Sequence, residues 1–275
     1  MDTTSPLGVF DSGVGGLSVL RALRAELPHE DVIYLADQAH VPYGSRSLEE
    51  VRAFSGEITR FLIARDAKLI AVACNTASAA ALHWLRQRHP EIPFVGMEPA
   101  VKPAAETTRS GVVGVLATPA TFQGELYASV VERFARGVTV LQATCPGLVG
   151  QIEAGELDSE RTRRILERAL EPMLKRGVDT LVMGCTHFPF AIPAIQRIAG
   201  SGVRVIDPAP AVARQAGRLL AARGLLNPSG APGAVGFYTS GESSQLEALL
   251  PRLLGEPHPV ESVAWQGNAL RISST

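Results

Sequence analysis

Two short stretches of the chain could do chemistry, and each carries a cysteine at the end of an apolar run. Residues 71–77 read Ala-Val-Ala-Cys-Asn-Thr-Ala, and residues 182–189 read Val-Met-Gly-Cys-Thr-His-Phe-Pro. This pattern is typical of a buried strand that leaves a sheet and enters a binding loop. Cys74 and Cys185 are therefore candidates for one shared site.

A single cysteine at a strand exit is more often a small buried hydrophobe than a reactive group. The chain, however, contains this strand-exit cysteine twice, and an acid-proline pair follows each copy at a similar distance. An acid-proline pair follows Cys74 by 24 residues, at 98–99, and another follows Cys185 by 22 residues, at 207–208. The repeated spacing indicates a duplicated unit, which would place the two thiols at equivalent points.

Two equivalent thiols that face each other across a cleft suit a racemase. Inverting a carbon that bears an acidic hydrogen requires a base on one face and an acid on the other, and the roles swap in the reverse reaction. A thiol with a pKa of about 8.5 can take either role after a modest shift. Neighbouring acid-base residues such as Asp11 and His187 could set the state of each thiol.

Strand patterns and helix patterns alternate regularly along the chain, and these elements must position the candidate residues. Strands are expected near 8–11, 31–36, 69–73, 92–95, 111–116, 138–143, 180–184 and 203–206, with helices between them. The pattern predicts an α/β fold of two similar pseudo-symmetric lobes, each a mainly parallel sheet with helices on both faces, and an active site in the cleft between them.

The acid-proline pairs suggest where one lobe gives way to the other. The first lobe is expected to comprise residues 1–98 plus 208–275, and the second lobe residues 99–207. In the first lobe, glycines 13, 15 and 16 follow the first strand and precede a helix, so their loop could approach a ligand closely and offer N–H groups to an anion. A small carboxylate suits this loop better than a pyrophosphate, because G-x-G-x-x-G would need glycine where Ser18 stands.

Composition gives no support to several other classes of function. The 275 residues are 46% hydrophobic and 19% charged with a net charge of −1, which favours a globular protein without an electrostatic footprint for nucleic acid or anionic lipid. No apolar run approaches the length of a membrane span and the N-terminus lacks a signal peptide, so a cytoplasmic location is expected. The three cysteines are expected to be free thiols.

No cofactor and no metal are expected. A pyridoxal phosphate enzyme needs a lysine for its Schiff base, and the chain has only Lys68 before a strand, Lys102 in an expected loop and Lys175 late in a helix. The histidines outside residues 182–189 are scattered without the spacing of metal ligands. Cys145 has no counterpart in the first lobe, and we expect it to serve packing.

Four motifs together resemble those of the glutamate racemase family. They are Gly8-Val-Phe-Asp-Ser-Gly-Val-Gly-Gly-Leu17, Val41-Pro-Tyr-Gly44, Ala73-Cys-Asn-Thr-Ala-Ser78 and Gly184-Cys-Thr-His-Phe-Pro189. The likeness runs from about residue 7 to at least residue 254 and includes Phe237-Tyr-Thr-Ser-Gly241. Members of this family racemise glutamate without a cofactor and supply D-glutamate for bacterial peptidoglycan biosynthesis.

The resemblance implies roles for particular residues. It makes Cys74 and Cys185 the two proton donors and acceptors, with Asp11 and His187 as assisting groups. Glu153 matches a family acid near the second cysteine, although the run after Cys145-Pro146 departs from the family pattern. The resemblance implies a homodimer, and it places substrate contacts at Asp11, Ser12, Tyr43, Gly44, Asn75, Thr76, Thr118, Thr186 and His187.

Two other functions fit parts of the pattern. A sister racemase that acts on aspartate would use the same fold and cysteine pair, and a substrate panel separates it from a glutamate racemase. A non-catalytic amino-acid binder would have no use for paired thiols, and would keep its ligand affinity after replacement of Cys74 or Cys185 by alanine. The role of Asp37 stays open between a turn cap and a substrate contact.

Overall fold

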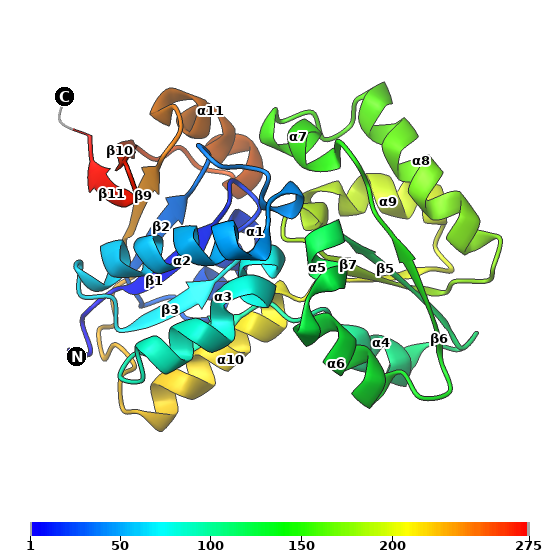
Figure 1. Cartoon of the computed structure of the whole chain (residues 1–275), viewed down its shortest axis with the longest axis horizontal. Coiled ribbons are helices and arrows are strands. Elements are labelled where there is room, and N and C mark those ends of the chain that lie inside the picture. The colour runs from blue at the N-terminus through cyan, green and yellow to red at the C-terminus, as the bar shows by residue number, and fades with distance from the viewer. Residues whose placement is uncertain (1, 274–275) are drawn as a thin grey trace.

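The protein contains two β-sheets, and the cleft between them lies at the ends of their central strands. The computed structural model describes residues 2–273 and shows two α/β lobes side by side (Figure 1). The first sheet has seven strands in the order β11-β10-β9-β2-β1-β3-β4, and the second has four in the order β6-β5-β7-β8. All the neighbouring strands run parallel except β10 and β11.

The strands are short and mostly apolar. They are β1 (Leu7–Asp11), β2 (Val32–Ala36), β3 (Leu69–Val72), β4 (Phe94–Gly96), β5 (Val112–Ala117), β6 (Thr139–Ala143), β7 (Thr180–Gly184), β8 (Arg204–Ile206), β9 (Val235–Thr239), β10 (Val260–Gln266) and β11 (Ala269–Ile272). The central strands β1, β3 and β7 are buried along their whole length, as expected for parallel strands covered on both faces.

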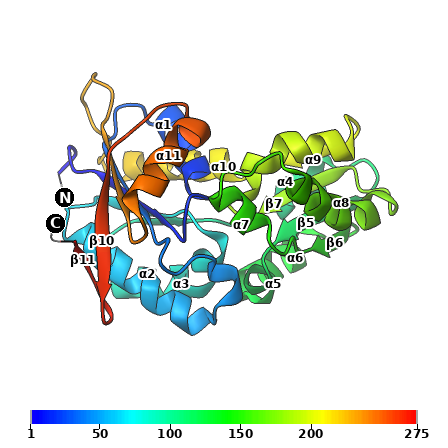
Figure 2. The same cartoon turned by 90° about the horizontal axis from the view of Figure 1, so that it is seen from above.

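Helices cover both faces of each sheet. They are α1 (Leu17–Glu26), α2 (Leu48–Ile63), α3 (Asn75–Arg88), α4 (Val101–Thr107), α5 (Pro119–Gln123), α6 (Glu125–Phe134), α7 (Leu148–Glu153), α8 (Glu160–Leu174), α9 (Ile192–Ala199), α10 (Ala209–Ala222) and α11 (Ser243–Leu254), with 3-10 turns η1 (Tyr43–Ser45) and η2 (Phe188–Ala191). Helices α1 and α10 pack together on one face of the first sheet, and α2 and α3 on the other (Figure 2).

The two lobes share one topology. In the first sheet β1 lies between β2 and β3, with β4 beyond β3; in the second, β5 lies between β6 and β7, with β8 beyond β7. The order of four successive strands is therefore the same in both lobes. This confirms the predicted fold class of two similar, mainly parallel α/β lobes.

The C-terminal part of the chain completes the first sheet. Strand β9 pairs in parallel with β2, and β10 pairs with β9, so residues 235–266 extend the sheet that the N-terminal strands begin. Residue 1 and residues 274–275, which the expected first lobe includes, lie outside the described residues. Within residues 2–273, no helix has both the length and the apolar character needed to cross a membrane.

Two elements differ from the sequence prediction. Residues 101–107 form helix α4, so Lys102 lies on a helix and not in a loop. Pro103 stands at the third helical position, within the first turn, where its missing N–H has no partner to lose. The hairpin of β10 and β11 was not predicted, because its residues alternate only partly between buried and exposed positions.

Candidate active site

Both candidate cysteines lie where equivalent strands end. Cys74 follows β3 and occupies the N-cap of α3, where its Sγ accepts a hydrogen bond from Ala77 N at 3.5 Å. Cys185 follows β7 directly. The two side chains are 5% and 6% exposed, and both line one small cavity between the lobes.

The cavity collects most of the residues that the sequence singled out. It is lined by Ser12, Pro42, Tyr43, Gly44, Cys74, Asn75, Thr76, Thr118, Val149, Cys185, Thr186 and His187. The cavity has a volume of about 20 Å³, and a cleft of about 700 Å³ adjoins it. The cleft and the cavity share Pro42, Gly44, Thr118 and Val149, which places the two thiols next to the cleft.

Asp11 lies behind the cavity wall and does not line it. Its carboxylate is fully buried and accepts hydrogen bonds from Gly16 N at 2.6 Å, Ser12 Oγ at 3.4 Å and Thr186 Oγ1 at 3.5 Å. Burial raises the pKa of Asp11, although the charge of His187 opposes the shift. Burial and the negative charge of Asp11 raise the pKa of Cys74 well above its usual value, which favours the thiol form in the free protein.

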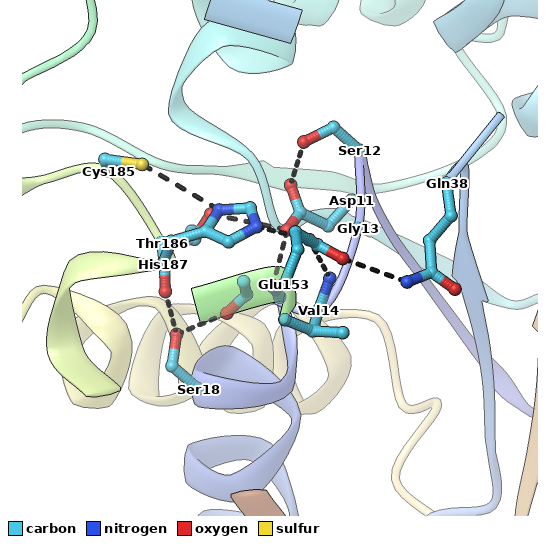
Figure 3. Close-up of polar contacts among 12 residues, drawn as sticks. Asp11, Ser12, Gly13, Val14, Ser18, Gln38, Glu153, Cys185, Thr186 and His187 are labelled. Atoms are coloured by element: carbon cyan, nitrogen blue, oxygen red, sulfur yellow. Dashed lines mark hydrogen bonds and ion pairs between the residues drawn. The ribbon is translucent and has the colours of Figure 1, made fainter. Parts of the chain in front are cut away.

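His187 stands between Cys185 and an acid. Its Nδ1 lies 3.9 Å from Cys185 Sγ, and its Nε2 lies 2.6 Å from Glu153 Oε1 (Figure 3). Burial lowers the pKa of His187, but its hydrogen bonds to Cys185 and Glu153 and the charge of Glu153 outweigh burial and raise the pKa well above its usual value. Burial alone would raise the pKa of Glu153, but the hydrogen bond and the charge of His187 outweigh burial, so the pKa lies below its usual value. Both shifts favour an imidazolium paired with a carboxylate.

Glu153 also joins the two lobes. Its Oε1 accepts a hydrogen bond from Val14 N at 2.7 Å, and its Oε2 accepts one from Gln38 Nε2 at 2.9 Å. A Cβ at position 13 would collide with the Glu153 carboxylate, and one at position 15 with the His187 ring, so only glycine permits this approach.

The glycine loop of the first lobe therefore binds carboxylates, as its sequence predicts. The carboxylates in the structure are the protein's own, because Val14 N donates to Glu153 (Figure 3) and Gly16 N donates to Asp11. The expectation that these N–H groups face a small-molecule carboxylate was not met at these two positions.

Asn75 presents unused hydrogen-bonding groups to the cavity. The residue is 3% exposed, and neither Oδ1 nor Nδ2 has a partner within the protein. Buried amide groups are almost always paired, so both atoms are suited to a ligand that offers a donor and an acceptor. Nearby, Thr76 Oγ1 of the first lobe lies 3.0 Å from Thr118 Oγ1 of the second, and Thr118 caps α5.

Three neighbours of the site were not predicted. Pro42 and Val149 line the cavity, and Gln38 binds Glu153. Pro42 belongs to the motif Val41-Pro-Tyr-Gly44, so its sequence signal was present. Val149 lies in the run after Cys145-Pro146, and Gln38 follows a strand without any motif of its own.

The charges at the site belong mainly to carboxylates and one imidazolium. The cavity lining contains no lysine or arginine, and Arg46 lies in the adjoining cleft. Anionic groups of a ligand would therefore meet hydroxyl and N–H donors first. Within the described part of the chain, no cluster of three or more His, Cys, Asp or Glu is arranged to hold a metal ion.

The fold and the site together define a class of protein. Two lobes of the same topology each place one thiol at a shared cavity, which suits an amino-acid racemase, because inversion needs an acid and a base on opposite faces of one carbon. The chain belongs to the Asp/Glu/Hydantoin racemase family, whose model matches residues 17–216.

Individual relatives agree with this assignment. A glutamate racemase of Roseiflexus sp. is 53% identical over 249 residues, which cover 90% of this chain and 92% of that protein. The crystal structure of a glutamate racemase from Bacillus anthracis has a TM-score of 0.87 at 33% identity, covering 97% and 99% of the two chains. A Francisella tularensis glutamate racemase in complex with D-glutamate has a TM-score of 0.82 at 30% identity, covering 95% and 98%. The resemblance to glutamate racemases is confirmed.

Proposed function

We propose that the protein is a glutamate racemase that interconverts L- and D-glutamate by a two-base mechanism without a cofactor. The observation that carries the proposal is the placement of Cys74 and Cys185 after equivalent strands of the two lobes, at one cavity. The relatives named as glutamate racemases, at about half identity over nearly the whole chain, support glutamate as the substrate.

The cavity offers both donors and acceptors to an amino acid. Asn75 can donate from Nδ2 to a carboxylate oxygen and accept at Oδ1 from an ammonium group. The hydroxyl groups of Ser12, Thr76, Thr118 and Thr186 add donors from both lobes. We assign these residues, with Tyr43 and Gly44, to substrate binding, and the donors to stabilisation of the carbanion-like transition state.

Two proton transfers complete the inversion. One cysteine, as the thiolate, takes the α-proton and becomes a thiol, while the electron pair stays on the α-carbon. The other cysteine, as the thiol, gives its proton to the opposite face and becomes the thiolate. The enzyme then holds the protonation pattern for the reverse reaction, and either a reverse turnover or proton exchange with water restores the first pattern.

Asp11 and His187 influence the protonation of the two thiols. In the free protein the raised pKa of Cys74 favours the thiol, which is the form that donates a proton to the α-carbon. His187 is placed to donate a hydrogen bond from Nδ1 to Cys185 Sγ while Glu153 holds its other nitrogen. Glu153 is thus a positioning residue for His187.

Solvent isotope incorporation tests the proposal. Purified protein is incubated with L- or D-glutamate in deuterated water without added cofactor, and both enantiomers are analysed early in the reaction. Two bases predict deuterium at the α-carbon of the product enantiomer and little in the remaining substrate. Folded protein that causes no racemisation would exclude the activity, and equal labelling of both enantiomers would exclude the two-base mechanism. A parallel reaction with aspartate separates the sister activity.

We further propose the organisation that the family resemblance implies. One lobe comprises residues 1–98 plus 208–275 and the other residues 99–207, and the pairing of β9 with β2 supports this division. The protein acts in the cytoplasm as a homodimer and supplies D-glutamate for peptidoglycan biosynthesis. Sedimentation at several protein concentrations tests the dimer, and rescue of a D-glutamate-requiring bacterial strain tests the role in the cell wall.

A further inference from the structure

Two consecutive residues after β2 reach in different directions toward the active site. Asp37 accepts a hydrogen bond from Tyr43 OH at 2.6 Å, and Tyr43 lines the cavity from the first lobe. Gln38 donates from Nε2 to Glu153 Oε2 at 2.9 Å, and Glu153 holds His187 in the second lobe. The exit of one strand therefore supports groups on both sides of the cavity.

Asp37 is fixed by more partners than a turn cap requires. Besides Tyr43, its carboxylate is in hydrogen-bonding contact with His40 Nδ1 at 2.9 Å, Ser240 Oγ at 2.6 Å and Trp265 Nε1 at 2.8 Å. A carboxylate has about four lone-pair sites, so these four partners occupy them all. Asp37 is fully buried and has no free site for a substrate, which answers the alternative left open by the sequence.

The residues that hold this pair come from the C-terminal part of the chain. Ser240 and Trp265 contact Asp37 Oδ1, and Thr239 Oγ1 donates to Gln38 Oε1 at 2.8 Å. Thr239 is fully buried at the end of β9, and Trp265 lies in β10. The family motif at residues 237–241 therefore contacts Asp37 and Gln38, although none of its residues lines the cavity.

We propose that Thr239, Ser240 and Trp265 are positioning residues for the reaction. Ser240 and Trp265 orient Asp37 and, through it, Tyr43 on the substrate side of the first lobe. Thr239 orients Gln38 and, through it, Glu153 and His187 beside Cys185. The inference rests on the proposed racemisation, and it makes the C-terminal strands part of the catalytic scaffold.

Trp265→Phe is a direct test, because it keeps an aromatic ring against Phe54 and His40 while it removes the indole N–H together with the five-membered ring. Tyr43 meets the substrate in both the ground state and the transition state, so a looser Tyr43 should raise KM for both enantiomers about three- to tenfold, the scale of one weakened hydrogen bond. Turnover should change by no more than about twofold. Ser240→Ala removes a different donor to the same oxygen and should act in the same way.

A double-mutant cycle identifies the route. If Trp265 acts through Asp37 and Tyr43, then Trp265→Phe adds little to the KM of a Tyr43→Phe variant, whereas independent effects would multiply. The matched control is Trp84→Phe, which removes the other tryptophan, on α3, and should keep the wild-type KM. Melting curves confirm that each variant is folded at the assay temperature.

Thr239→Val tests the other branch, since it replaces the hydroxyl by a methyl group of similar size. It should change the primary α-deuterium isotope effect for one enantiomer more than for the other, because only the Cys185 side is disturbed. Wild-type protein without racemase activity would defeat the proposed function itself. Active wild type, with unchanged KM in both Trp265→Phe and Ser240→Ala and unchanged isotope effects in Thr239→Val, would overturn the positioning role alone.

Discussion

Glu153 Oε1 accepts a hydrogen bond from Val14 N at 2.7 Å, although 139 residues separate the two and they lie in different lobes. The same oxygen lies 2.6 Å from Nε2 of His187, the neighbour of Cys185. One carboxylate therefore joins the contact between the lobes to the histidine beside Cys185, which we propose as one of the two catalytic thiols. A change at this contact should alter the reaction without touching the substrate.

Gly13→Ala makes such a change from the first lobe. The new Cβ would collide with the Glu153 carboxylate, so Glu153 must move and release His187. We expect kcat/KM to fall about 10²-fold, the usual effect of displacing a catalytic group by about 1 Å. The assay measures both enantiomers, whose kcat/KM values must stay equal because L- and D-glutamate have the same free energy. Gly202→Ala, at a site with open space around it, is the control, and equal activity of the two variants would contradict the prediction.

Glu153→Gln should change how stability depends on pH. The pKa of Glu153 is lowered in the folded protein, so its contribution to stability is present above its unfolded pKa of about 4.5 and is lost as the pH falls through the folded value. The pKa of His187 is raised, so its contribution is present below about 6.5 and is lost as the pH rises through the folded value. Both contributions are complete between about pH 4.5 and 6.5.

The stability lost in Glu153→Gln should therefore be largest in that window, at about 2 kcal/mol, and should shrink at higher pH. Denaturant unfolding at a series of pH values measures it. Glu156→Gln, an exposed acid three residues along, provides the control and should show no such window. A loss that grows as the pH rises from 6.5 to 9 would contradict the assignment of the ion pair.

Asn75→Leu should separate stability from binding. Both amide atoms of Asn75 are buried without partners, and an unsatisfied buried polar group costs about 1–3 kcal/mol. A leucine of similar shape removes that cost, so the free protein should melt at a higher temperature. Glutamate should raise the melting temperature of wild type by binding to the folded state, and it should no longer do so in the variant. A lower melting temperature of the free variant would show that the amide serves the fold and not a ligand.

The parts of the site that could be predicted from the sequence are those marked by a pattern in neighbouring residues. Cys74 and Asn75 follow an apolar run of strand length, and Thr186 and His187 follow another, so position relative to a strand end was enough to place them. Parallel sheets bring such ends to one edge, which explains why residues over a hundred positions apart could be assigned to one cavity before its geometry was known.

The parts that were missed depend on contacts between distant side chains. Asp37 and Trp265 are 228 residues apart, and Gln38 and Glu153 are 115 apart. Neither pair leaves a periodicity or a spacing that a single sequence can show. The glycine loop shows this limit: its sequence predicted an anion, but only the structure identifies the bound carboxylates as Asp11 and, from the other lobe, Glu153.

Alanine variants of the two cysteines should lose racemisation and should each retain hydrogen exchange with a different enantiomer. Replacing either by alanine removes the acid or base from one face, and racemisation should fall about 10³-fold or more. The remaining thiol can still remove and return the α-proton on its own face. Cys74→Ala should therefore exchange the α-hydrogen of one enantiomer with deuterated water, without inversion, and Cys185→Ala should exchange that of the other enantiomer.

Cys145→Ala is the matched control for this experiment. Cys145 is buried, its pKa is raised to about 12 chiefly by burial, and it lines the adjoining cleft rather than the cavity. Its loss should leave racemisation within about threefold of wild type, since no proton transfer depends on it. Proton NMR of each enantiomer in deuterated water measures the exchange. If both active-site variants exchanged the same enantiomer, the thiols could not stand on opposite faces of the α-carbon, and the mechanism would have to be rebuilt around a single base.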